Sequence, residues 1–125
     1  MILVDASVWV DYFRVGDEEL ASILEAGEVL THRFVVGELA LGNLPNRERY
    51  LLFLNRLPRT AEATHEEVLD VVQRHRLFGI GIGYVDAHLL AALGLTPHTI
   101  LWTRDRRMTS AADRLGLATR RTYRA

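Results

Sequence analysis

The sequence predicts an α/β protein in which helices flank a mainly parallel central sheet. Short apolar segments alternate with longer segments of helical periodicity along the chain, which is typical of this class. The first segment, residues 1–4, reads MILV with no polar residue in it. Such a run is expected of a central parallel strand that is covered on both faces. The chain has 125 residues, and we treat residues 1–125 as a single domain.

Four further segments are predicted as strands, and each is short. They are EVLTH at 28–32, RTAEA at 59–63, TILW at 99–102 and LATRR at 117–121. RTAEA carries little apolar surface, so we expect it at an edge of the sheet. The connection GIGIG at 79–83 contains three glycines and is predicted as a flexible turn into the next helix.

Seven segments have helical periodicity. Thr64 with Glu67 three residues later forms the sequence pattern of a capping box, which marks one of the starts. Asp11 has Arg14 three residues on, and we expect these two to pair on the helix surface. The predicted helices begin with VWVDYF after Ser7 and continue with residues 17–27, 33–43, 46–57, 65–78, 84–95 and 108–116.

The composition is that of a soluble protein without covalent cross-links. There is no cysteine, so neither a disulfide framework nor a thiolate metal site is available. The N-terminus lacks the basic region of a signal peptide, and no apolar run approaches the roughly 20 residues of a membrane span. From these observations we expect a cytoplasmic protein.

The charges are unevenly distributed along the chain. The net charge is −1, and all 15 basic side chains are arginines. Seven of these arginines lie between residues 104 and 124, where only two acids accompany them. The sequence therefore predicts a basic C-terminal part on a more acidic body.

Two aspartates directly follow predicted strands. Asp5 comes after MILV, and Asp105 comes shortly after TILW. In an open α/β sheet, ligands bind at the carboxyl ends of the strands. Taken alone, either aspartate is explained equally well as the cap of the helix that follows it.

Two other acids lie among apolar helical neighbours. Glu38 has Phe34 and Leu41 at helical spacing, and Asp86 has Ile82 and Leu89. We expect both acids on core-facing stripes, where a carboxylate is costly unless it is paired or binds a metal ion.

Together, the four acids predict a metal site. Clustered carboxylates repel one another unless a cation neutralises them, and Mg²⁺ or Mn²⁺ takes carboxylate oxygens as ligands. A site of this kind hydrolyses phosphodiester bonds by activating water. For each acid singly, a structural role as a cap or as the partner of a buried arginine remains the alternative.

Four motifs in order resemble the PIN domain, and specifically the VapC ribonuclease toxins of bacterial toxin–antitoxin pairs. The motifs are MILVDASVW, VVGELALG, GYVDAHLLAAL and LWTRDRRM, and the resemblance covers essentially the whole chain. It implies that Asp5, Glu38, Asp86 and Asp105 are the metal-binding, catalytic acids. It also implies that Ser7 and Thr103 are hydrogen-bonding residues beside the first and last acids.

The resemblance further implies a function and partners. We expect a Mg²⁺- or Mn²⁺-dependent endoribonuclease toxin whose substrate is a structured RNA such as a transfer or ribosomal RNA. A VapB-like antitoxin would silence it, and the toxin would be a homodimer. The competing interpretation is a non-catalytic PIN-like module that binds RNA or acts as a scaffold, against which the four intact acids argue.

We predict which residues of the protein contact the antitoxin and the RNA. We expect an antitoxin segment in a groove near Trp9, Phe13 and the helix that contains Glu38, with a basic side chain beside the carboxylates. The aromatic residues themselves fit core packing best. Arg104, Arg106 and Arg107 flank Asp105, and they are predicted either to contact RNA phosphates or to be solvated surface residues.

Three other kinds of site are weighed and set aside. The five histidines include no HxxxH pair, so a zinc site is not expected, and His32 is given a surface or structural role. The glycines of GIGIG follow no strand of the kind that a dinucleotide-binding loop requires. A phosphatase with an Asp-x-Asp nucleophile needs a second acid at position 7, where this chain has Ser7.

Overall fold

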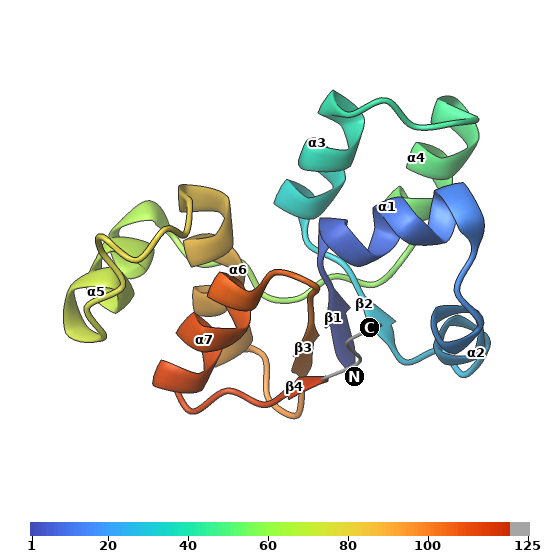
Figure 1. Ribbon diagram of the computed structural model, residues 1–125. Helices are drawn as coiled ribbons and strands as arrows, with labels where there is room; N and C mark the ends of the chain where they lie inside the picture. Colours follow the sequence, from blue (N-terminus) through green and yellow to red (C-terminus); the bar gives the residue numbers. More distant parts are fainter. Residues whose placement is uncertain (121–125) are drawn as a thin grey trace.

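The computed structural model describes residues 1–120, and a four-stranded sheet forms its centre (Figure 1). The strand order is β2-β1-β3-β4, and every pair is parallel, as predicted. The two central strands pair along their whole length, from Ile2 with Ile100 to Val4 with Trp102. Their carboxyl ends therefore lie side by side. The strands are β1 (Ile2–Val4), β2 (Val29–Leu30), β3 (Ile100–Trp102) and β4 (Thr119–Arg120).

Helices flank this sheet. In Figure 1, α5, α6 and α7 lie to the left of the sheet, and α1 to α4 lie to its right and above it. The helices of the described residues are α1 (Ala6–Val15), α2 (Glu18–Glu25), α3 (Arg33–Leu41), α4 (Arg47–Asn55), α5 (His65–Arg74), α6 (Tyr84–Leu95) and α7 (Arg106–Arg114).

The core is built on β1 and on the aromatic residues of α1. Every residue of β1 is buried, as the unbroken apolar run predicts. Trp9 is fully buried and stacks on Phe13 with ring centroids 5.5 Å apart, while Phe13 stacks on Tyr50 of α4 at 4.1 Å. These rings fill the space between α1 and α4, which confirms that they pack in the core, and an antitoxin groove near them stays a prediction.

Helix α6 is a core helix. An unbroken run from Ala87 to Leu93 is buried, so the helix is surrounded on nearly all sides. Within residues 1–120, no helix is both long enough and apolar enough to cross a membrane.

Several predicted elements or boundaries differ from the observed ones. RTAEA forms no strand, and only an isolated bridge joins Arg59 to Thr31. Helix α5 ends at Arg74, well before Phe78. Helix α7 begins at Arg106, two residues earlier than predicted, because Asp105 caps it. The predicted last strand is observed at Thr119–Arg120, and its residue 121 lies outside the described residues.

Candidate active site

Asp5 is buried at the carboxyl end of β1 and accepts three hydrogen bonds. Its Oδ1 accepts from the backbone N–H of Ala6 at 2.8 Å and so caps α1. Its Oδ2 accepts from Ser7 Oγ at 3.0 Å and from Thr103 Oγ1 at 2.8 Å. Asp5 is therefore a helix cap through one oxygen only, and the two hydroxyls orient the other oxygen.

Asp105 lies beside Asp5 because β1 and β3 are neighbours. The backbone N–H of Asp5 donates to the carbonyl of Trp102 at 2.9 Å, which joins the two strand ends. Asp105 caps α7, and its Oδ1 accepts from the N–H of Arg107 at 2.9 Å. Its own N–H donates to Thr103 Oγ1 at 3.1 Å, so Thr103 contacts both aspartates.

Glu38 lies on an exposed face of α3, which corrects the predicted core-facing stripe. The buried residues of this helix are Val35 and Leu39, whereas Phe34 and Leu41 on the Glu38 side are 38% and 90% exposed. Apolar residues lie on two faces of α3, and only the face with Val35 and Leu39 packs on the core. The side chain of Glu38 has no hydrogen bond or ion pair with any residue that the structure describes.

Asp86 is half-buried in the first turn of α6. Its Oδ2 accepts a long hydrogen bond of 3.4 Å from the N–H of Gly83. The residues that follow, Ala87 to Leu93, are buried, so this helix is fixed in the core.

The four acids are linked by electrostatic coupling. The pKa of Glu38 is raised above its ordinary value, first by burial and then by the charges of Asp5 and Asp86. The pKa of Asp86 is also raised, chiefly by burial, with further contributions from Asp5 and Asp105 that oppose the hydrogen bond from Gly83. Glu38 is thus coupled to Asp5 and Asp86, and Asp86 to Asp5 and Asp105, although these acids come from β1, α3, α6 and the β3–α7 junction.

The four acids supply the carboxylate oxygens that a divalent ion takes as ligands. None of the four acids forms an ion pair within residues 1–120, so their repulsion is left for a cation to neutralise. In the same residues, no three His, Asp or Glu side chains converge into a ready-made chelating group. Mg²⁺ keeps several waters and is held by one or two carboxylates with substrate phosphate, which suits this arrangement.

Ser7 and Thr103 join the two strand ends, as expected of the small polar residues beside the acids. Their hydroxyl oxygens are 3.4 Å apart, and both contact Asp5 Oδ2. Ser7 Oγ also accepts from the backbone N–H of Arg104 at 3.1 Å. The segment after β3 is thus anchored to the segment after β1 through side-chain hydrogen bonds.

The three predicted RNA-contacting arginines differ in their surroundings. The guanidinium of Arg104 contacts Asp11 through Nη1 and Asp17 through Nη2, the latter at 2.8 Å. Asp11 therefore pairs with Arg104, and not with Arg14 as its helical spacing predicted. Arg106 and Arg107 are exposed in the first turn of α7, which leaves them available to a phosphate.

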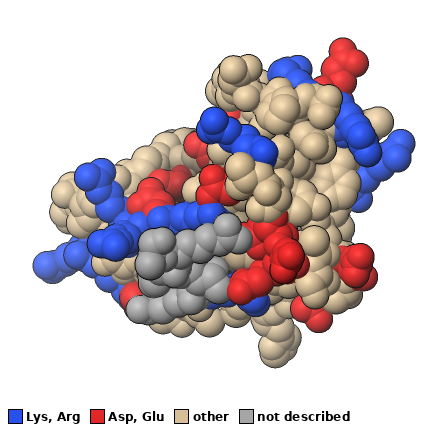
Figure 2. Space-filling model, turned by 45° about the vertical axis from the view of Figure 1, so that its right-hand side comes forward, with Lys and Arg blue, Asp and Glu red and all other residues tan. Residues whose placement is uncertain are grey.

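No local sequence pattern predicts the contacts of Arg104. Asp11 and Asp17 lie 93 and 87 residues away along the chain, and neither pairing follows from local spacing. Figure 2 shows acidic and arginine side chains interleaved across the middle of one face of the molecule.

His32 and His88 have structural roles. His32 is buried and caps α3, because its Nδ1 accepts from the N–H of Phe34 at 3.0 Å. His88 is buried between aromatic rings, with the Phe34 and Tyr84 centroids each 4.6 Å away. The structural role assigned to His32 is confirmed.

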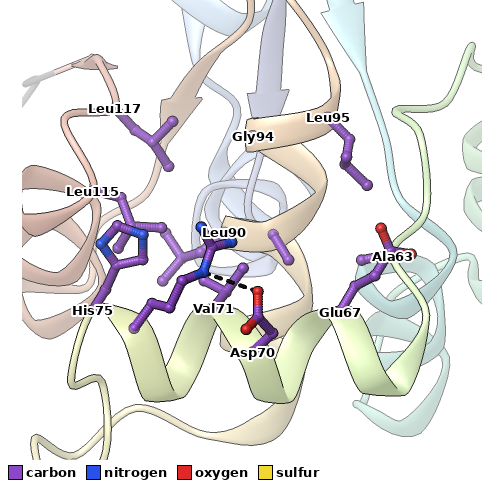
Figure 3. A pocket seen from close by; sticks show the side chains of 12 residues that line it. Ala63, Glu67, Asp70, Val71, His75, Leu90, Gly94, Leu95, Leu115 and Leu117 are labelled. Carbon is purple, nitrogen blue, oxygen red and sulfur yellow. Dashed lines mark ion pairs between the residues drawn. The ribbon is translucent and has the colours of Figure 1, made fainter.

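A separate hollow lies between α5, α6 and the α7–β4 connection (Figure 3). It has a volume of about 270 Å³, and its floor includes Leu90, Leu115 and Leu117. Asp70 and Arg74 form an ion pair of 2.9 Å at its rim. None of the four clustered acids lines it, so the hollow is distinct from the carboxylate site.

The fold and the carboxylate cluster define the protein's class. The PIN domain family model matches residues 2–114, and the chain belongs to this family. The chain is 43% identical over 118 residues to Ribonuclease VapC32 of Mycobacterium tuberculosis, and the match covers 94% of this chain and 95% of that protein. The values are the same for the proteins of strains H37Rv and CDC 1551. A crystal structure of FitAcB from Neisseria gonorrhoeae shares the fold, with a TM-score of 0.63 at 21% identity, over 95% of this chain and 96% of that one.

Proposed function

We propose that the protein is a divalent-metal-dependent endoribonuclease, a toxin of the VapC type. The observation that carries the proposal is the cluster of Asp5, Glu38, Asp86 and Asp105, in which two carboxyls have raised pKa values and none has an ion-pair partner within residues 1–120. The name of the Mycobacterium relative supports RNA as the substrate. We further treat residues 1–125 as one functional domain that acts in the cytoplasm.

The four acids are the residues that would hold Mg²⁺ or Mn²⁺. Such an ion, when bound, supplies an activated water and offsets the charge on the attacking and leaving oxygens. Ser7 and Thr103 keep Asp5 Oδ2 in one orientation, and the N–H of Arg107 does the same for Asp105 Oδ1.

Glu38 is suited to move a proton at this site. Its side chain is exposed and has no hydrogen bond to a described residue, so a carboxylate oxygen that does not contact the ion is available as a general base. We assign to a carboxylate oxygen of Glu38 the acceptance of a proton from the attacking water. The buried Asp5 cannot serve in this way without giving up the hydrogen bonds that hold it.

The RNA phosphates are assigned to Arg106 and Arg107. Both lie directly beside Asp105, and both are exposed. Each contact would release counterions and make binding dependent on salt. The substrate class, a structured transfer or ribosomal RNA, follows from the resemblance to VapC toxins.

The partner is assigned as a VapB-like antitoxin. The exposed side chains of Phe34 and Leu41 flank Glu38 and present apolar surface next to the acids, which supports an inhibitor bound at α3. A small neighbouring reading frame should encode a protein that copurifies with this one and relieves its growth arrest. The active unit is assigned as a homodimer, which light scattering of the purified protein tests.

Cleavage of RNA in Mg²⁺ or Mn²⁺, and its absence in EDTA, tests the proposal. Asp86→Asn should abolish cleavage, whereas Asp70→Asn removes an acid of α5 that is paired with Arg74 and should leave it intact. RNA ends sequenced after a pulse of expression would identify the target. Binding of RNA without cleavage, at any metal concentration, would favour the non-catalytic module instead.

A further inference from the structure

Arg104 joins three parts of the molecule at the edge of the carboxylate site. It lies between Thr103 and Asp105, each of which is part of the site's hydrogen-bond network. Its guanidinium leaves this segment and contacts Asp11 on α1 and Asp17, the cap of α2. The Asp17 side chain is only 3% exposed and that of Arg104 only 23%, so these charges meet largely out of water.

The backbone of Arg104 takes part in the same connection. Its N–H donates to Ser7 Oγ at 3.1 Å, and Ser7 in turn donates to Asp5 Oδ2 at 3.0 Å. Ser7 and Asp11 are four residues apart on α1, so they lie on one face of the helix. The main chain and the side chain of Arg104 therefore hold α1 at two successive turns.

We propose that Arg104 is a positioning residue for the metal site: by clamping the Thr103–Asp105 segment to α1 and α2, it fixes the hydroxyls that orient Asp5. This inference rests on the proposed function. Arg104 was predicted as an RNA contact. It is reassigned as a residue that holds parts of the protein together, because both of its terminal nitrogens already contact carboxylates. Replacing residues that orient metal ligands typically costs roughly 10- to 100-fold in metal affinity or activity.

Arg120 supplies a matched control. It too crosses to α2, where its Nη2 lies 3.0 Å from Glu19 Oε2, and its guanidinium lies 5.0 Å from the Trp102 ring centroid. The two arginines thus attach the acidic start of α2 to the C-terminal half of the protein. Only Arg104 contacts the network around Asp5.

The test compares Arg104→Lys with Arg120→Lys in the full chain. Lysine keeps the positive charge but cannot hold two carboxylates as the forked guanidinium does. Retaining the charge matters, because removing a cation beside an acidic cluster would by itself tighten metal binding. We expect Arg104→Lys to weaken the affinity for Mn²⁺, measured by isothermal titration calorimetry, by about tenfold, as for other orienting partners.

Kinetics and stability complete the comparison. Arg104→Lys should lower kcat at saturating Mn²⁺ with little change in KM for RNA, because the lost orientation concerns the reacting groups. Both lysine variants should melt at a lower temperature than wild type, whereas Arg120→Lys should keep wild-type Mn²⁺ affinity and kcat. If Arg104→Lys does not fold, Asp11→Glu keeps the negative charge, displaces the carboxylate that Arg104 Nη1 contacts at a half-exposed position, and should weaken Mn²⁺ binding a few-fold.

Two results separate the inference from the function on which it rests. If wild type binds Mn²⁺ and cleaves RNA while Arg104→Lys equals it in both Mn²⁺ affinity and kcat, Arg104 serves stability alone and the inference is overturned. If wild type neither binds Mn²⁺ nor cleaves RNA, the proposed function fails and the inference fails with it.

Discussion

Thr103 Oγ1 donates a hydrogen bond of 2.8 Å to Asp5 Oδ2 across 98 residues of sequence. The two residues are close because β1 and β3 pair in register up to Val4 and Trp102. Asp5 and Thr103 are the residues that directly follow these strands, so they lie at the same edge of the sheet. Thr103 is 4% exposed, and Asp5 is 6% exposed. A hydrogen bond between a buried hydroxyl and a carboxylate is worth more than an ordinary one, and its removal is measurable.

Thr103→Val tests this hydrogen bond while keeping the shape of the side chain. We expect the protein to lose about 1–2 kcal/mol of unfolding free energy, because Asp5 keeps Ser7 as its other hydroxyl donor. Metal affinity and cleavage rate should fall about tenfold. The control is Thr99→Val, at a buried threonine whose hydroxyl donates to the carbonyl of Pro97. Equal effects of the two variants on metal affinity would contradict the role given to Thr103.

Much of the fold follows from local sequence patterns. The apolar run 1–4 predicted a buried parallel strand, and β1 is that strand. Thr64 and Glu67 predicted a capping box, and both of its hydrogen bonds are present. RTAEA was assigned wrongly because a five-residue segment with alternating small residues contains too little information to separate strand from loop.

The site was only partly open to prediction. The positions of Asp5 and Asp105 follow from strand ends, which a sequence pattern reveals. The exposure of Glu38 does not follow from a sequence pattern. Apolar residues lie on two faces of α3, and their spacing along the sequence is the same whether one face or both faces pack against the core. The pairing of Arg104 with Asp11 is a tertiary contact between charged residues, and no local pattern encodes it.

Glu38→Gln should change the pH dependence of stability in EDTA. The pKa of Glu38 is raised in the folded state by burial and by two neighbouring acids, so its stabilising contribution is complete below the unfolded pKa of about 4.3. That contribution is lost as the pH rises through the folded pKa. At pH 7 without metal, the variant should therefore be at least as stable as wild type.

Melting temperatures from pH 4 to pH 7.5 measure this effect. The difference between Glu38→Gln and wild type should grow in favour of the variant as the pH rises, and Mg²⁺ should reverse it. Glu48→Gln, at an exposed acid in the first turn of α4, is the control and should show no such trend. A variant that melts below wild type at every pH in EDTA would mean that Glu38 is stabilising there.

His32→Asn should weaken the acid sensitivity of α3. Burial lowers the pKa of His32, helped by His88 and Arg33 and opposed by Glu62, so the neutral ring is favoured in the folded state. Its stabilising contribution is thus complete above about pH 6.5 and is lost as the pH falls through the lowered folded pKa. Protonation at Nδ1 also removes the acceptor that caps α3.

Asparagine keeps a capping oxygen and does not titrate. It leaves space in the core, so we expect a cost of about 1–3 kcal/mol at pH 8 but a smaller loss between pH 8 and pH 5.5 than in wild type. His98→Asn, at an exposed histidine, serves as the control. Parallel pH curves for wild type and His32→Asn would show that the titration of His32 contributes nothing.

Gly81→Ala should disturb Arg107. A Cβ at Gly81 would lie 3.0 Å from Cδ and Nη1 of Arg107, and the residue has a φ of +86°. Gly79 has a φ of +71° but open space around it, so Gly79→Ala carries the backbone strain without the clash. Both variants should lose about 1 kcal/mol or more of stability, and only Gly81→Ala should move the arginine.

Salt dependence of RNA binding reports on that arginine. If Arg107 contacts a phosphate, Arg107→Ala should lower the slope of log K against log salt by roughly one, and Gly81→Ala should follow it in part. Gly79→Ala should retain the wild-type slope. An unchanged slope for Arg107→Ala would place this residue on the solvated surface.

Asp5→Asn tests most directly whether the carboxylate cluster exists to hold a metal ion. Asparagine can cap α1 with its oxygen, and its NH₂ group can donate to the hydroxyls of Ser7 and Thr103, which are able to reverse their roles. The variant should therefore cut no RNA, yet in EDTA it should be as stable as wild type or more so, by on the order of 1 kcal/mol, since repulsion from Glu38 and Asp86 is relieved. Thermal melts in EDTA and in excess Mg²⁺ should show a clear gain for wild type and little for the variant. A variant that melts well below wild type in EDTA and still cleaves RNA would show that Asp5 is only a helix cap.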